Sequence, residues 1–115
     1  MLNQVRESSV LPEEKAGQWV KSGMTIAIGE PAPMGLLRWI IRNKITDLTV
    51  IGSGLALDYL IAGGCVRKVI TYYAGSPDIA VMPAFRSEAE NGTLEVWECE
   101  EGILTSGLEA AGKGL

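Results

Sequence analysis

Small residues and one carboxylate follow three short apolar segments of this chain, at 24–29, 48–51 and 66–73. If these segments are parallel strands of one sheet, the turns meet at its carboxyl edge, where α/β proteins bind ligands. Glycine and serine there let a ligand approach the backbone closely. The candidate ligand-binding residues are Gly29, Glu30, Gly52, Ser53, Gly54, Tyr73, Gly75 and Ser76.

Glu30 is the acidic member of this set and lies in a turn with Pro31 and Pro33. The two prolines exclude both a helix interior and a central strand at this point. Glu30 therefore lies in a loop. It is either an ordinary exposed carboxylate or a group that faces a bound ligand.

The turn Gly52-Ser53-Gly54 resembles the beginning of a dinucleotide-binding motif. The third glycine is missing, and the segment 66–73 ends in tyrosine rather than in an acidic residue. A tight strand-to-helix turn explains the glycines without any ligand. The remaining interpretation is a different phosphate-bearing or acyl ligand bound near the beginning of a helix.

No catalytic residue and no metal ligand set can be assigned within the chain. It contains no histidine, which excludes Ser-His and Cys-His pairs and histidine metal sites. Cys65 and Cys99 are widely separated and lie in apolar surroundings, as expected for buried free thiols in a reducing compartment. Glu90 precedes Asn91-Gly92, a sequence typical of a helix C-cap rather than of a nucleophile.

Nine segments alternate between helical and extended patterns. Gly23, Pro12 and Glu13 are typical boundary residues of the first helix. The predicted helices are 11–22, 33–43, 56–62, 80–91 and 102–111, and the predicted strands are 24–29, 48–51, 66–73 and 93–99.

The alternation at roughly 20-residue spacing predicts right-handed crossovers between parallel strands. The expected fold is a three-layer α/β domain, in which a mainly parallel sheet of about four strands carries helices on both faces. We expect Trp19, Trp39 and Trp97 to point into its core.

Length and composition are those of one globular α/β domain, assigned to residues 11–115, after a polar segment 1–10. The net charge of −4 and the scattered basic residues argue against nucleic-acid binding. No segment reaches the about 18 apolar residues of a membrane span, and residues 1–10 lack a signal-peptide pattern. A cytoplasmic location is therefore expected.

Four stretches together resemble the N-terminal half of the α subunit of family I CoA-transferases, the glutaconate CoA-transferase type above all. The resemblance covers about residues 10–115, and its specific parts are the sequences SGMTIAIG, TDLTV and LIAGGCVRKVITYY. The stretches are 22–29, 45–54, 58–76 and 85–115.

The resemblance implies an enzyme with an α and a β half. A glutamate of the β half attacks an acyl-CoA and forms a glutamyl-CoA thioester, and CoA then passes to another carboxylate. The α half supplies loops that line this site, which would match 29–32, 52–54 and 73–76 here. A coenzyme A thioester is then a substrate, no cofactor is bound covalently, and a β-type subunit is the expected partner.

The first loop departs from the family, which usually carries Gly-Gly-Phe where this chain has Gly29-Glu30-Pro31. Proline donates no backbone hydrogen bond, and Glu30 adds negative charge where an anionic substrate or oxyanion needs donors. The alternative is therefore a non-catalytic module that binds acyl-CoA or another small ligand. Because four strands leave open edges, we expect a homo-oligomer where no β-type partner is present. A flavodoxin-like or other nucleotide-binding domain remains a third interpretation, based on architecture alone.

Overall fold

A computed structural model describes residues 10–78 and 80–115. The predicted polar segment 1–10 thus lies, apart from Val10, outside the described residues. No helix in the described ranges is long and apolar enough to cross a membrane.

Four parallel strands form the central sheet in the order β1-β2-β3-β6. They are β1 (Thr25–Ala27), β2 (Leu48–Ile51), β3 (Val66–Thr71) and β6 (Glu95–Glu98). Successive side chains of a strand point to opposite faces of the sheet. The register aligns Ile26, Val50, Val69 and Val96 on one face, and Ala27, Ile51, Ile70 and Trp97 on the other.

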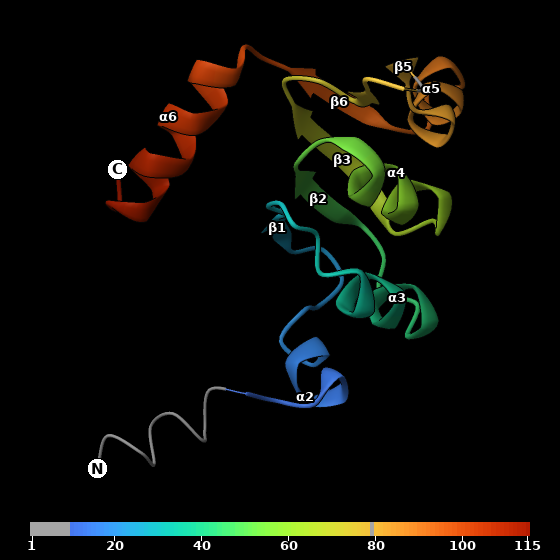
Figure 1. Cartoon of the computed structure of the whole chain (residues 1–115), viewed down its shortest axis with the longest axis vertical. Coiled ribbons are helices and arrows are strands. Elements are labelled where there is room, and N and C mark those ends of the chain that lie inside the picture. The colour runs from blue at the N-terminus through green and yellow to red at the C-terminus, as the bar shows by residue number, and fades with distance from the viewer. Residues whose placement is uncertain (1–9, 79) are drawn as a thin grey trace.

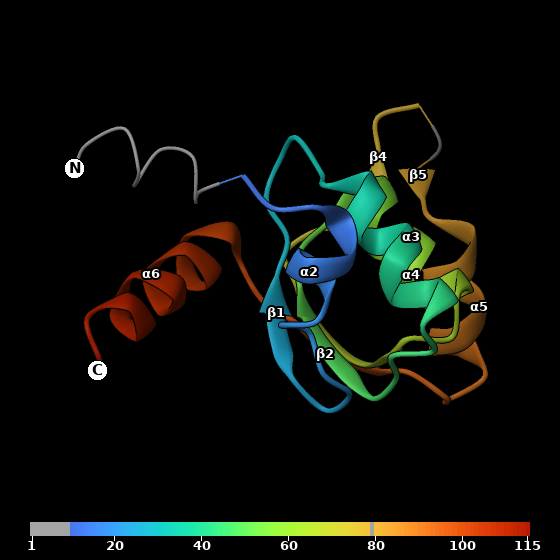
Figure 2. The same ribbon diagram turned by 90° about the horizontal axis from the view of Figure 1, so that it is seen from below.

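The helices cover the two faces unequally. The helices α3 (Met34–Arg42), α4 (Gly54–Ala62) and α5 (Pro83–Glu90) connect neighbouring strands and lie together on one side (Figure 1). Right-handed crossovers between strands added in one direction place every connecting helix on the same face. α6 (Glu101–Gly112) follows the last strand and lies on the opposite side (Figure 2). The predicted parallel sheet with helices around it is confirmed.

The core lies between the sheet and the three connecting helices. Its strand residues Leu48, Val50 and Val69 are fully buried, as is Leu60 of α4. We call this the inner face of the sheet, and the face toward α6 the outer face. Continuous β-branched sequence in β2 is typical of a strand covered on both sides, and Thr49 on the outer face is also buried.

The first helix is shorter than predicted and one tryptophan packs against it. α2 covers only Glu13–Gly17, and the chain then turns. A Cβ atom added to Gly17 would lie 2.3 Å from the ring of Trp39, so this helix backbone lies directly against that side chain. Glu13 forms an ion pair with Arg42 at the end of α3, with 2.6 Å between carboxylate and guanidinium. Trp39 is partly buried and packs against the core from its edge, so the prediction that it points into the core holds only in part.

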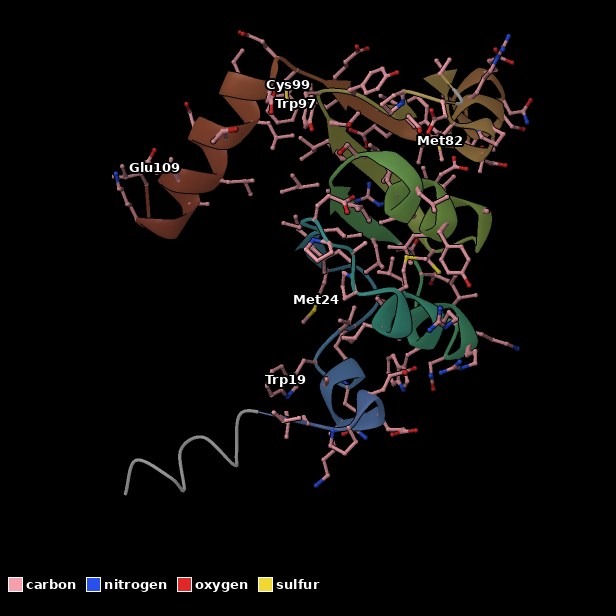
Figure 3. All side chains as sticks on the ribbon, in the orientation of Figure 1. Trp19, Met24, Met82, Trp97, Cys99 and Glu109 are labelled. Carbon is pink, nitrogen blue, oxygen red and sulfur yellow. The ribbon has the colours of Figure 1, made fainter. Side chains whose placement is uncertain are left out.

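The other two tryptophans are not in the core. Trp19 is 72% exposed because α2 ends before it, and Trp97 is 53% exposed. Trp97 points to the outer face of β6, an edge strand whose outer face is not covered by a connecting helix. The prediction that both lie in the core was wrong. Figure 3 shows Trp97 near the passage from β6 to α6, and Trp19 far from it.

A small hairpin precedes α5 and was not predicted. β4 (Gly75–Ser76) pairs with β5 (Ala80–Val81) in antiparallel orientation. The predicted helix 80–91 therefore begins only at Pro83, which occupies a first-turn position where proline needs no hydrogen bond. The other predicted elements are present with ends shifted by up to two residues.

Candidate functional site

The carboxyl ends of β1 and β2 enclose a crevice with a volume of about 260 Å³. Four of the eight candidate residues lie together in its lining, namely Gly29, Glu30, Gly52 and Ser53. The remaining lining residues are Ala27, Ile28, Ile51, Tyr72, Leu104 and Leu108. The crevice therefore lies at the edge of the sheet where parallel α/β proteins bind ligands.

Tyr72, and not Tyr73, lines this crevice. Tyr73 lies instead in a separate hollow with Thr71, Val81, Phe85 and Glu98, on the side of α5. Side chains alternate along an extended chain. Thr71 belongs to the inner face, so Tyr72 turns to the outer face and Tyr73 again to the inner one.

Gly75 and Ser76 belong to the hairpin and lie outside the crevice lining. A Cβ atom on Gly75 would approach the carbonyl oxygen of Ala80 to 2.4 Å, which explains the glycine by close backbone packing. The Ser76 hydroxyl accepts a hydrogen bond from the amide of Asp78 at 3.4 Å. Gly54 lies close to this hairpin, because a Cβ on it would be 3.9 Å from the Gly75 carbonyl oxygen.

The beginning of α4 forms one wall of the crevice. Ser53 precedes the helix in an extended conformation, and its side chain makes no capping hydrogen bond. Gly54 has a φ of +65°, which favours glycine over residues with a side chain. A helix N-terminus carries partial positive charge and attracts anionic groups.

Glu30 is the charged side chain of the crevice lining. It is exposed, and among the described residues that line the crevice there is no lysine or arginine. Within the same described part of the chain, the ion pairs also leave Glu30 without a partner. A second carboxylate in this crevice would thus meet repulsion rather than a cation.

The two cysteines differ in their surroundings. Both are free thiols, and Cys65 is buried in the turn between α4 and β3, where burial raises the pKa of its thiol. Its Sγ donates a weak hydrogen bond to the carbonyl of Gly63 at 3.6 Å. Cys99 is only partly buried, which corrects the expectation of two buried thiols.

The tripeptide from Glu90 to Gly92 ends α5, as predicted. Asn91 is the C-cap residue, and Gly92 follows with a φ of +75°. Glu90 pairs with Arg86 one helical turn earlier, at 2.9 Å. This carboxylate lies before β6 and hence at the amino edge of the sheet, away from the crevice.

Six lining residues were missed in the sequence, and two of them, Leu104 and Leu108, come from α6. Their spacing of four places both on one side of the helix, but a helical period does not tell which surface that side meets. Among the described residues, no group of three or more acidic, cysteine or histidine side chains could hold a metal ion.

Comparison with known proteins supports the resemblance seen in the sequence. The family described as Coenzyme A transferase matches residues 11–115. The chain is 36% identical to the Rhodococcus jostii cholesterol ring-cleaving hydrolase IpdA subunit, over 96% of this chain and 39% of that protein. It is 29% identical to one subunit of the Helicobacter pylori succinyl-CoA:3-ketoacid coenzyme A transferase, over 89% of this chain and 46% of that protein.

The fold is also shared with a solved structure, that of a variant of the decarboxylase AibA/AibB. The TM-score is 0.82 at 27% identity, over 91% of this chain and 44% of that one. This chain thus spans less than half the length of these relatives. Because the family match extends over nearly all of the sequence, the chain belongs to the coenzyme A transferase family.

Proposed function

We propose that this chain is the α-type half, or part of it, of an enzyme that acts on acyl-CoA thioesters. The observation that carries the proposal is the crevice at the carboxyl edge of the sheet, built from the turns 29–30 and 52–53 in a chain of this family. We assign residues 11–115 to one domain and place the protein in the cytoplasm, in accord with its two free thiols.

In this proposal the chain's own residues bind and orient the thioester. Gly29 and Gly52 allow the ligand to approach the backbone, and the first turn of α4 offers amide groups to an oxyanion or a phosphate. The other four candidate residues support these loops from outside the crevice lining: Gly75 and Ser76 in the hairpin, Tyr73 just before it, and Gly54 at the beginning of α4. The attacking glutamate belongs to a β-type partner: it takes CoA while the donor acyl group leaves as a free carboxylate, and CoA then passes to a second carboxylate, which frees the glutamate.

The names of the relatives support a partner. Two of them are named as subunits, and the solved structure carries two component names. A homo-oligomer is the arrangement we propose where that partner is absent, because β1 and β6 are open edges of the sheet.

Glu30 favours a second candidate function. A transferase of this type needs to admit a free carboxylate as acceptor, whereas the described lining of this crevice carries a carboxylate and no cation. The alternative is a module that binds an acyl-CoA or another small ligand without transferring CoA.

Calorimetric titration of the purified chain tests the main proposal. We expect saturable binding of butyryl-CoA that Gly29→Leu weakens at least about tenfold. Gly29 lines the crevice and a Cβ on it meets no described atom within 4 Å, so the backbone has room for the first atom of the new side chain. Gly112→Leu is the matched control, because Gly112 also has open space and lies outside the crevice. A folded chain that binds neither CoA nor butyryl-CoA would contradict the proposal.

Free butyrate separates the two candidates, because a transferase must admit a free carboxylate as the acceptor of CoA. A transferase crevice should bind butyrate in the presence of CoA. Under the alternative, Glu30 repels this carboxylate, so that butyrate binding is lost, and Glu30→Gln restores it.

A further inference from the structure

A second hollow, of about 200 Å³, lies between α6 and the outer face of the sheet. On the sheet side it is lined by Ile51, Ile70, Trp97 and Cys99, and on the helix side by Ile103, Leu104, Gly107, Leu108 and Ala111. Figure 3 shows Trp97 and Cys99 where β6 passes into α6. We call this hollow the α6 groove.

The α6 groove adjoins the crevice. Ile51, Leu104 and Leu108 line both hollows, so a ligand can extend from one into the other past these side chains. Each hollow alone is smaller than the about 300 Å³ at which small-molecule sites begin, whereas the two together reach that range. The pair therefore has the size of one elongated ligand.

The two hollows differ in chemistry. The crevice has loop backbone, the Ser53 hydroxyl and the Glu30 carboxylate, whereas none of the described residues that line the α6 groove is charged. A hollow with apolar walls offers water few hydrogen-bond partners and is suited to an apolar ligand. An acyl-CoA has this same division, with a polar thioester carbonyl at one end of an apolar chain.

We propose that the α6 groove binds the acyl chain of the thioester, and that this chain is uncharged, aliphatic and longer than acetyl. The proposal rests on the function proposed above and adds the substrate class. Ile51, Leu104 and Leu108 are the side chains that guide the acyl chain out of the crevice.

Gly107 sets the space available to the acyl chain. It lies within α6, where glycine is the least favourable residue apart from proline. A Cβ on Gly107 meets no described atom within 4 Å although the residue lines the groove. The backbone at this lining position therefore has room for a Cβ, and we expect a larger side chain there to take up space at the groove.

The test compares acetyl-CoA with octanoyl-CoA on the complete 115-residue chain by calorimetry. Each buried methylene contributes about fourfold to affinity, so octanoyl-CoA should bind at least about tenfold more tightly than acetyl-CoA. Gly107→Leu should reduce this preference to within about twofold. Gly112→Leu, the same change in the same helix but outside the groove, should leave the preference intact.

The reactivity of Cys99 provides an independent measurement, because its side chain lines the groove. The chain has two cysteines in all, so one substitution is enough to leave Cys99 as the single thiol. Octanoyl-CoA should slow the alkylation of Cys99 by iodoacetamide, whereas acetyl-CoA at equal saturation should not. A Cys65→Ser variant restricts the labelling to Cys99.

The outcomes separate the two proposals. Equal binding of the two thioesters would overturn the acyl groove and leave the proposed function standing. Binding of neither would overturn both. A dimer that protects Cys99 without any ligand would assign the groove to a second copy of the chain and overturn the acyl assignment.

Discussion

Both faces of the sheet carry apolar side chains, and the outer one adds the Lys68–Glu95 ion pair, yet the two faces differ in how they are covered. On the inner face, Val50 and Val69 are fully buried beneath α3, α4 and α5. On the outer face, Ile51 and Ile70 are only partly buried, and Trp97 is largely exposed. α6 stands over this face and leaves the α6 groove between itself and the sheet.

The contrast assigns the two faces different roles. Close-packed side chains on the inner face provide most of the stability, because each buried apolar group is removed from water. The outer face retains apolar surface and open space next to the crevice, and space of this kind is available to a ligand. Substitutions on the inner face should therefore cost far more stability than substitutions on the outer face.

Leu60→Ala should lower the free energy of unfolding by about 2–5 kcal/mol, because Leu60 is fully buried on the inner side and its removal leaves a cavity. Ile103→Ala on α6 is the comparison, and it should cost less than about 1 kcal/mol because Ile103 is 55% exposed. Urea denaturation of both variants measures the difference. Equal losses would show that the outer face is as tightly packed as the inner one.

Asp58→Ala should cost about 1–3 kcal/mol, because a buried carboxylate of α4 holds the first turn of α5. The amide of Phe85 donates to one carboxylate oxygen at 2.7 Å, and the amide of Ala84 donates to the other at 3.4 Å. Asp58→Asn keeps one acceptor and should lose less. If thermal unfolding of both variants matches the parent chain, α5 is held by its apolar contacts alone.

Alkylation rates should also distinguish the faces, with Cys99 reacting at least about tenfold faster than Cys65 at neutral pH. Cys65 is buried on the inner side and burial raises the pKa of its thiol, so less of the reactive thiolate is present. The Cys65 rate should accordingly continue to rise as the pH passes the ordinary thiol range. Mass spectrometry of the labelled chain identifies the site, and preferential labelling of Cys65 would contradict the burial pattern.

Local sequence patterns were sufficient for most of the fold. The apolar run 48–51 is bounded by Gly52, and the ends of α4 and α5 follow from Gly64 and Gly92, whose positive φ angles other residues adopt rarely. The hairpin was not predicted because its strands, 75–76 and 80–81, have only two residues each. A segment of two residues is too short to show the alternation of apolar and polar residues that identifies a strand.

Part of the candidate site could also be predicted from local sequence patterns. Parallel strands bring their carboxyl ends to one edge, so Gly29 and Gly52 had to lie near each other once the strands were recognised. The third turn was assigned to the same place, but Gly75 is taken up by the hairpin and Tyr73 turns toward α5. Whether a residue of the third turn lines the crevice depends on the face of the sheet to which its side chain points. A shift of one residue along the strand exchanges the two faces.

The sequence by itself determined the order of strands and helices, the parallel sheet, the loops at its carboxyl edge and the resemblance to one family. These follow from local periodicity, from turn residues and from motifs, all of which act over short stretches of chain. Only the tertiary structure decided that α3, α4 and α5 share one face, that Trp97 is exposed, and that Gly107 lies over open space beside the crevice. The direction in which each new strand joins the sheet decides which face the connecting helices cover. Contacts between residues that are distant in sequence depend on this direction, which no local pattern reveals.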